Sequence, residues 1–354
     1  MKKLILGVAA LAAFATSCSD DQSQINPQEV KVDMSDFYVY TDSNLAERPA
    51  GEGVQTPCYT MQHLNELLSE DPGLERKMYD VEYNTRAFIA SKGKPGGGGG
   101  TGGGGTGEED VDELPINDGL GSITIPVYVH IVLPNANEVS NTQVSSQISV
   151  LNSDFNSTNA NQLPSAATNF ENDATVTDIH FSLAGTFRYN NPTSSWGTNN
   201  AVKNAYPPIT PETHLNIWVC DIGGGILGYA QFPGGNPNTD GVVLLYSSLP
   251  GGSATNYNQG RTATHEVGHY LNLRHIWGDG RCRQDDFVLD TPTSDAPNYG
   301  CPSYPTVNCS TTDMTMNYMD YTYDTCMYMF TDGQRNRMRA VFAPGGARAT
   351  MAGN

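Results

Sequence analysis

One short run contains two histidines that could bind a metal ion and a glutamate that could act as a base beside it. In the run from His265 to His269, the two imidazoles are four residues apart, so on a helix they share one face and can bind the same ion. Glu266 lies beside them, where it could accept a proton from water on the metal. His275 can reach the same ion only if the chain turns sharply after about Asn272, and Asn tolerates the positive φ of such a turn better than most residues. We therefore predict zinc on His265, His269 and His275, with Glu266 as general base.

The elements that must position this cluster follow from the spacing of apolar residues. Strands are predicted at 123–133, 178–187, 214–220 and 241–246, and helices at 139–156, 258–276 and 334–340. Pro, Gly, Asn and Asp are frequent from 278 to 310, which indicates an irregular region. We expect an α+β fold, in which an α/β-like part with a mixed, twisted sheet carries the zinc helix and an irregular part is held by disulfides.

The chain before residue 115 has a different composition. Leucines at helical spacing between 61 and 90 are interrupted by Asp71-Pro72-Gly73, so two helices are predicted. Eleven of the 15 residues from 93 to 107 are Gly, and acidic residues follow them, which is typical of a flexible linker. The predicted division is therefore a small helical region within 18–92, a linker at 93–114 and a main domain at 115–354.

Residues 1–17 have the features of an export signal. Two lysines precede an apolar run that is too short to span a bilayer. The run ends in Ala15-Thr16-Ser17-Cys18, which resembles a bacterial lipobox and predicts lipidation of Cys18. The expected location is the outer membrane or cell surface, with secretion if the protein is later released. The alternative is an ordinary secretory signal followed by an incidental cysteine.

The overall charge limits the class of partner. The chain has 19 Lys and Arg against 38 Asp and Glu, a formal net charge of −19. Binding to a nucleic-acid backbone needs a basic face, so no nucleic-acid partner is expected. Protein or peptide substrates are expected, with membrane contact only through the lipid anchor. The sequence carries no signal of an oligomeric state.

Six cysteines remain besides Cys18, and export changes how they are interpreted. Outside the cytoplasm, closely spaced cysteines favour disulfides. Four of them lie within 45 residues and predict two bridges, for which the sequence allows three pairings: Cys282, Cys301, Cys309 and Cys326. Cys220 lies in an apolar strand and is predicted to be a buried free thiol. Cys58 stands alone.

Several segments together resemble the pappalysin (cytophagalysin, M43-type) family of metzincin metalloproteases. Besides the histidine run with 276–279, they are Asp286…Asp290-Thr291-Pro292, 298–302, 317–321, and 215–220 with 228–230. The resemblance covers about residues 115–345, with a looser match at 58–90. Asn272 stands where the extended metzincin motif has Gly.

The resemblance implies a zinc metalloendopeptidase that is made as a zymogen. Met319 would be the Met-turn residue beneath the three histidines, although other methionines nearby fit a plain core role equally well. Tyr321 would stabilise the tetrahedral intermediate. In this family the four late cysteines pair first to third and second to fourth, which implies Cys282–Cys309 and Cys301–Cys326.

Calcium and latency are also implied. Asp286 and Thr291, with a backbone carbonyl near Leu289, match a calcium-binding segment of the family, although a solvated acidic loop explains the carboxylates nearly as well. Cys58 matches a proenzyme cysteine whose thiolate occupies the open zinc position, so Cys58→Ala would give a precursor that is active without processing. The alternatives for Cys58 are an incidental cysteine or a disulfide with Cys220.

Three other functions use the same residues. A purely structural zinc site does not account for Glu266 beside the ligands. An inactive surface-binding lipoprotein on a metzincin fold does not account for an intact Glu266 and Tyr321. Another class of zinc hydrolase, such as a gluzincin, would need an acidic third ligand in place of His275.

Some relatives prefer Arg after the scissile bond because of an acidic pocket residue, for which Asp324 is the candidate here.

Overall fold

The computed structural model describes residues 32–41, 57–92, 115–159 and 170–352. The predicted export signal, Cys18 and the whole of the predicted linker at 93–114 lie outside the described residues. All of these described residues belong to one compact unit. Among the described residues, no helix is long and apolar enough to cross a membrane.

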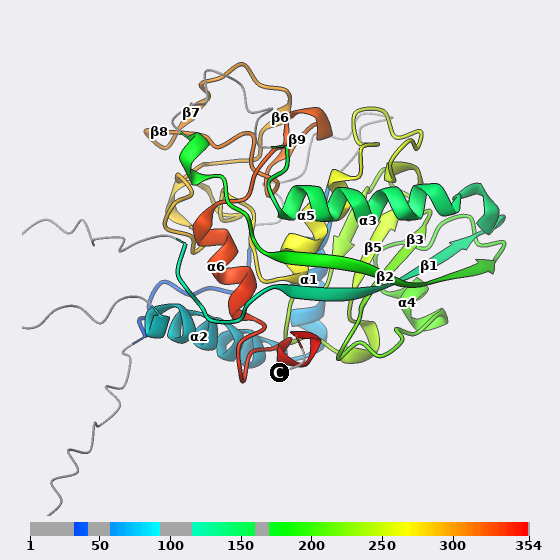
Figure 1. The fold of residues 1–354 in the computed structure, drawn as a ribbon, viewed down its shortest axis with the longest axis horizontal. Helices are drawn as coiled ribbons and strands as arrows, with labels where there is room; N and C mark the ends of the chain where they lie inside the picture. The colour runs from blue at the N-terminus through cyan, green and yellow to red at the C-terminus, as the bar shows by residue number, and fades with distance from the viewer. Residues whose placement is uncertain (1–31, 42–56, 93–114, 160–169, 353–354) are drawn as a thin grey trace, which may run out of the picture. The chain divides into compact units, whose positions relative to one another are not determined.

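A five-stranded sheet forms the centre of the main domain, with the strand order β2-β1-β3-β5-β4 (Figure 1). The strands are β1 (Ile123–Leu133), β2 (Ile179–Asn190), β3 (Leu215–Cys220), β4 (Gly228–Ala230) and β5 (Val242–Leu245). Four of them run parallel, and β4 pairs antiparallel with β5 at one edge. The mixed sheet of the predicted α+β fold is thereby confirmed.

Side-chain alternation along the strands builds a core on each face of the sheet. Ile217 and Val219 of β3 belong to the main core, which also contains apolar residues of α3 (Asn141–Phe155) and α5 (Arg261–Tyr270). Trp218, between them, belongs to a smaller core with residues around α4 (Ala201–Ala205). This period of two is what a strand buried on both faces requires.

Helix α5 is shorter than the predicted 258–276. It begins after Gly260, whose φ is 91°, and its last residue is Tyr270. Asn272 then takes a φ of 75°, and the amide of Leu273 donates back to the carbonyl of Gly268 at 3.0 Å. This is a left-handed helix end in which Asn replaces the commoner Gly. Apolar spacing continues past such an end, so the helix was predicted too long.

The irregular part of the domain is held by short pairings and two disulfides. Its elements are β6 (Tyr299–Gly300), β7 (Val307–Asn308), β8 (Thr311–Thr312), β9 (Tyr321–Thr322) and α6 (Asp332–Ala340). Disulfides join Cys282 to Cys309 and Cys301 to Cys326, the pairs that the family resemblance implies. Cys58 and Cys220 are free and buried, so the alternative disulfide between them is wrong.

Short 3-10 turns connect the elements: η2 (Ala136–Glu138), η5 (Pro237–Thr239), η6 (Tyr246–Ser248), η7 (Arg281–Arg283), η8 (Asp324–Cys326) and η9 (Ala349–Ala352).

Two helices precede the main domain, as the leucine spacing predicts. They are α1 (Thr60–Glu70) and α2 (Leu74–Lys92), and they are separated at Asp71-Pro72-Gly73. Apolar residues of both helices form a small core that also takes in Phe232 of the main domain. Helix α2 lies beside α6 (Figure 1), and α1 contacts β4. The helical region is therefore packed onto the domain that carries the histidines.

Candidate metal centre and active site

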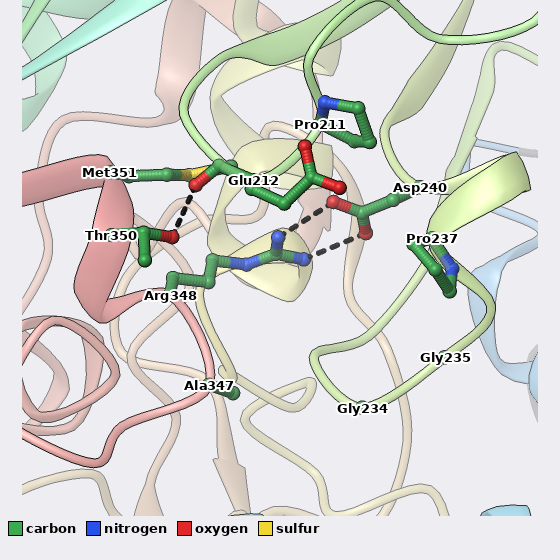
Figure 2. A pocket seen from close by; sticks show the side chains of 10 residues that line it. All are labelled: Pro211, Glu212, Gly234, Gly235, Pro237, Asp240, Ala347, Arg348, Thr350 and Met351. Atoms are coloured by element: carbon green, nitrogen blue, oxygen red, sulfur yellow. Dashed lines mark hydrogen bonds and ion pairs between the residues drawn. The ribbon is translucent and has the colours of Figure 1, made fainter.

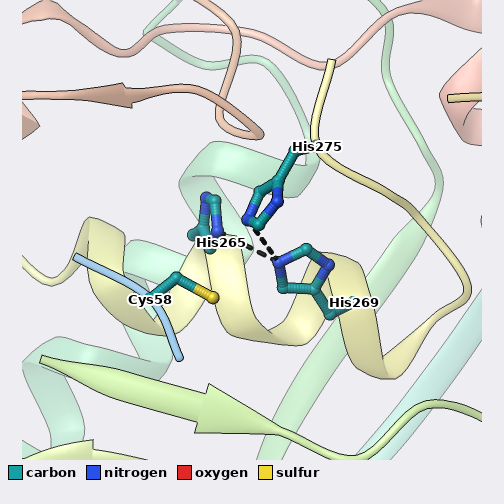
Figure 3. Close-up of side chains that lie close together, drawn as sticks. All are labelled: Cys58, His265, His269 and His275. Carbon is teal, nitrogen blue, oxygen red and sulfur yellow. Dashed lines mark hydrogen bonds between the residues drawn. The ribbon is translucent and has the colours of Figure 1, made fainter. Parts of the chain in front are cut away.

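Helix α5 carries His265 and His269 on one face, and the turn after the helix brings His275 to the same point (Figure 3). The Nε2 atom of His269 lies 3.1 Å from the Nε2 atom of His265 and 3.1 Å from that of His275. All three side chains are buried. The structure thus brings together the three histidines that the sequence proposes as ligands.

Each imidazole is oriented through its other ring nitrogen. The partner of Nδ1 is in every case an acceptor: the carbonyl of Tyr318 at 2.7 Å for His265, the carbonyl of Leu273 at 2.8 Å for His269, and a carboxylate oxygen of Asp279 at 2.6 Å for His275. Each Nδ1 therefore carries the proton and donates it, which leaves a lone pair on each Nε2. Three such lone pairs face one point.

This arrangement fits a zinc ion. Burial and the neighbouring His275 lower the pKa of His265 to about 3, so the ring is neutral and its lone pair is free to bind. Neutral rings with both Nε2 atoms unprotonated cannot hydrogen-bond to each other, so their close approach favours a shared cation. Tetrahedral zinc with nitrogen ligands at about 2.0–2.1 Å would separate those nitrogens by about 3.3 Å, close to the distances found here.

The turn at 317–320 packs against helix α5 and contacts one of the histidine ligands. A Cβ added to Gly268 would lie 2.5 Å from the Sδ atom of Met319, so α5 rests directly on this methionine because residue 268 has no side chain. Tyr318 supplies the carbonyl that orients His265. Met319 therefore occupies the place that the Met-turn resemblance gives it, and the neighbouring carbonyl has a role in orienting a ligand.

Glu266 and Tyr321 both lie at the metal centre and are fully buried. Burial raises the pKa of Glu266 to about 8, and hydrogen bonds from Thr60 and Cys58 offset part of that rise. The ring of Tyr321 lies 4.9 Å from the ring of His275, centroid to centroid. Burial also raises the pKa of Tyr321, so its hydroxyl stays protonated and can donate a hydrogen bond.

The segment before α1 enters this centre. The Sγ atom of Cys58 and one ring nitrogen of each histidine all lie within 4.8 Å of one another, and Figure 3 shows the sulfur pointing toward the three rings. The Thr60 hydroxyl donates to Oε2 of Glu266 at 2.6 Å and accepts from the amide of Ala230 at 2.8 Å. The Tyr59 amide donates to the carbonyl of Gly228 at 3.0 Å. This segment therefore contacts the proposed base and strand β4 at the same time.

A second contact between the helical region and the main domain lies on α2. Glu82 forms a bidentate ion pair with Arg337 of α6, at 2.7 and 3.0 Å, and also accepts from Arg86 at 2.7 Å. Glu82 and Arg337 are each 3% exposed. Burial by itself raises the pKa of Glu82, but the two arginines outweigh it and hold that pKa at about 2.

A third contact is made by residues 37–38. Arg274 donates to the carbonyl of Tyr38 at 2.7 Å, and its guanidinium lies 4.4 Å from the centre of the Tyr38 ring. The Tyr38 hydroxyl lies within hydrogen-bond distance of the carbonyls of Gly278 and Asp285. These contacts flank His275 on the chain, so the segment that precedes the two helices packs against the loop of the third histidine.

The segment proposed for calcium contains a buried carboxylate. Both oxygens of Asp286 lie near the Thr291 hydroxyl, at 2.8 and 2.9 Å, and one accepts from the amide of Val288. Burial and the adjacent Asp285 raise the pKa of Asp286. The side chain of Leu289 is a hydrocarbon without an oxygen atom, so only its backbone carbonyl could serve as a calcium ligand. Calcium here stays a prediction.

Asp324 lies in a small cavity beside His265. Pro57, Tyr257 and Thr322 also line this cavity. The backbone amide of Gln259 donates to Asp324 at 2.7 Å, while burial raises the pKa of its carboxyl to about 6. Arg261 lines the same cavity, so a positive charge already lies near this carboxyl group.

Sequence reasoning missed two residues at this centre, Thr60 and Asp279, and one at the contact between α2 and α6, Glu82. Thr60 has a weak signal, since it lies two residues after Cys58. Asp279 follows His275 by four residues, but no helix joins the two residues and no spacing rule predicts their contact. Glu82 has no signal, because its partner is 255 positions away in the chain.

A separate pocket of about 290 Å³ lies between the loops around Gly234 and Arg348 (Figure 2). Arg348 and Asp240 form a bidentate ion pair there, at 2.8 and 3.0 Å. No residue of the histidine centre lines this pocket. The guanidinium of Arg348 is thereby paired with Asp240, and Glu212 is a further carboxylate in the lining of the pocket.

Comparison with known proteins agrees with this site. Residues 210–343 match the family model described as pregnancy-associated plasma protein-A, a peptidase family. An extracellular metalloprotease of Arthroderma benhamiae is 35% identical over 243 residues, which cover 64% of this chain and 74% of that protein. The chain belongs to the pappalysin (M43) family. Another extracellular metalloprotease, from Sordaria macrospora, is 34% identical over 243 residues. That match covers 65% of this pappalysin and 78% of the Sordaria protein.

Solved structures extend the similarity. Mature mirolysin of Tannerella forsythia, in complex with a cleaved peptide, is 43% identical with a TM-score of 0.61, and covers 65% of this chain and 96% of that one. A promirolysin mutant from the same organism is 37% identical with a TM-score of 0.68, and covers 83% and 96%. The pro-form thus matches a larger share of this pappalysin than the mature form does. The chain has the fold and the zymogen organisation of promirolysin.

Proposed function

We propose that this pappalysin is an exported zinc metalloendopeptidase, made as a latent precursor. The observation that carries the proposal is the convergence of three Nε2 lone pairs beside the buried carboxylate of Glu266. Three ligands leave one position open, which is the pattern of a catalytic site rather than a structural one. The inactive-scaffold alternative leaves this intact set of groups without a role.

The chain's own residues supply the proton transfers. His265, His269 and His275 would hold zinc, which when bound supplies a Lewis acid that makes water acidic near neutral pH and polarises a carbonyl. Glu266 would take the proton from the attacking water on its carboxylate and deliver it to the leaving amine. The Tyr321 hydroxyl would donate a hydrogen bond to the developing oxyanion.

Substrate would bind as an extended strand along β4. In the precursor, the Tyr59 amide already donates to the Gly228 carbonyl at this edge, so pro-region backbone occupies the place of substrate backbone. Asp324, in the cavity beside His265, would favour a basic side chain after the scissile bond. Protein and peptide substrates are therefore the expected partners.

Latency would use two residues of the pro-region. The Cys58 thiolate would fill the open zinc position, and Thr60 would hold Glu266 by the 2.6 Å hydrogen bond. The Thr60 contact changes the expectation for Cys58→Ala, because the base and β4 stay occupied when the sulfur is removed. We therefore expect that variant to remain largely latent.

The remaining organisation is proposed on the sequence. Residues 1–17 would be removed on export, lipidated Cys18 would anchor the precursor at the outer membrane or cell surface, 18–92 would be the pro-region and 115–354 the catalytic domain. The segment with Asp286 and Thr291 would bind calcium. Activation would separate the pro-region from the catalytic domain.

Metal removal tests the proposed function. Protein whose pro-region has been removed by limited proteolysis should cleave casein, lose that activity with a zinc chelator, and regain it with about one equivalent of zinc. His275→Ala should lose bound zinc, because His275 is the third ligand. Full zinc content in that variant would instead support a hydrolase with a different third ligand, and chelator-resistant cleavage would contradict the proposal altogether.

A further inference from the structure

The three histidines are not held by equivalent partners. His265 and His269 donate to neutral backbone carbonyls, whereas His275 donates to the carboxylate of Asp279, at the shortest of the three distances, 2.6 Å. A carboxylate attracts the Nδ1 proton more strongly than an amide carbonyl does. It therefore leaves more electron density on Nε2, the atom that faces the metal position.

Asp279 is built into the structure for this contact. The residue is 1% exposed, and its second oxygen, Oδ2, is buried without a hydrogen-bond partner in the part of the chain that the structure describes. A buried carboxylate is costly unless a cation or several donors compensate it. The imidazole of His275 is the hydrogen-bond donor that the structure gives it, so the charge of Asp279 is directed at the metal centre.

The backbone also departs from its ordinary conformation to place this carboxylate. Gly278 has a φ of 62° and Asp279 a φ of 58°, so two successive residues are left-handed. For a residue other than Gly this conformation costs on the order of 1 kcal/mol, and Asp and Asn tolerate it best. The Gly278 amide closes the turn by donating to the carbonyl of His275 at 2.9 Å.

Trp277 completes the support of the third ligand. Its ring stacks on the ring of His275 at 4.2 Å between centroids and an angle of 6°. His275 lies beyond the end of α5, so no helix backbone fixes its direction as it does for the other two histidines. Stacking on Trp277 fixes the plane of the ring, and the bond to Asp279 fixes its rotation within that plane.

We propose that Asp279 is a positioning residue that acts through His275 and strengthens zinc binding at this site. This inference rests on the proposed zinc site. The charge of Asp279 makes His275 a stronger ligand than a carbonyl partner would, and its hydrogen bond holds the tautomer in which Nε2 can bind metal.

The test measures zinc affinity in the full-length precursor with Asp279→Asn and Asp279→Gly, because both replacements tolerate the positive φ of this position. Asn keeps a hydrogen-bond acceptor but removes the charge, and Gly removes both. The dissociation constant for zinc should rise about 10-fold for Asn and about 100-fold for Gly, the range typical of lost outer-sphere partners. With cobalt in place of zinc, the visible spectrum should shift in both variants.

Asp313→Asn is the matched control, since Asp313 is a buried carboxylate of the same irregular part and bonds to Asn308 rather than to a histidine. It should lower the melting temperature of the metal-free protein and leave zinc affinity and the cobalt spectrum unchanged. Wild-type affinity in both Asp279 variants would overturn the inference. A loss of zinc affinity that is matched by an equal loss of stability in the metal-free protein would also overturn it. Failure of the wild-type precursor itself to bind zinc would instead overturn the proposed function.

Discussion

The buried ion pair between Glu82 and Arg337 should control how firmly the pro-region is held. We consider Glu82→Gln, which removes the charge and keeps the shape. The pKa of Glu82 falls from the ordinary 4.5 to about 2 in the folded precursor, which corresponds to about 3 kcal/mol of stabilisation of the ionised form. Both partners are 3% exposed, so screening by water does not reduce this figure greatly. Arg86 lies on α2 itself and stays beside Glu82 when the helix undocks, so the variant should weaken docking by up to about 3 kcal/mol.

Hydrogen exchange of α2 amides in the full-length precursor measures this effect. A loss of about 3 kcal/mol raises the population of the undocked pro-region, and with it the exchange rate, about 100-fold at neutral pH. Asp80→Asn is the matched control, because Asp80 forms an exposed ion pair with Arg76 on the same helix. Exposed ion pairs contribute at most about 1 kcal/mol, so the exchange rate of α2 amides in this control variant should change by less than 10-fold.

The same pair predicts how stability depends on pH. Since the pKa of Glu82 is lowered in the folded state, its stabilisation is fully present above about pH 4.5 and is lost as the pH falls toward about 2. Denaturant midpoints of the wild-type precursor should fall across that range more steeply than those of Glu82→Gln. Equal exchange rates in the two proteins, or equal pH dependence, would refute the assignment of this pair as the pro-region's anchor.

Other predictions concern latency, the turn and the oxyanion. Cys58→Ala should stay largely latent, whereas Cys58→Ala with Thr60→Val should cleave a fluorogenic peptide without processing; equal activity of the single and double variants would refute the role of Thr60. Asn272→Gly should bind zinc as the wild type does, whereas Asn272→Val should lose zinc, because a β-branched residue resists a φ of 75°. Metal analysis separates the two. Tyr321→Phe should lower kcat about 100-fold with little change in KM, and an unchanged kcat would remove Tyr321 from the mechanism.

Local rules predicted the elements of this fold well. The strand at 123–133 and the break at Asp71-Pro72-Gly73 follow from alternation and from turn-forming residues, and both were placed correctly. The end of α5 was placed wrongly, because apolar residues continue past Tyr270. The helix ends there because the backbone at Asn272 is left-handed. The requirement for a turn near Asn272 was nevertheless evident from the position of His275.

Spacing alone predicted the site only where its residues are close in the chain, while Cys58, Met319 and Tyr321 were assigned by the family resemblance. His265, Glu266 and His269 share a helix, so their convergence follows from helical geometry. Thr60 reaches Glu266 across 206 positions of sequence, and such a contact depends on the docking of the whole pro-region. The contact of Asp279 with His275 depends on two left-handed residues, for which the sequence shows only a single Gly.

Peptide hydrolysis by Glu266→Ala tests the central claim most directly. The wild type and this variant would be freed of the pro-region in the same way and incubated with one peptide library. Since the three histidines are unchanged, the variant should still bind one zinc ion, while its cleavage rate falls by a factor of about 10³ or more. If the zinc-loaded variant digests the library as fast as the wild type, Glu266 is not the base and the account of this site is wrong.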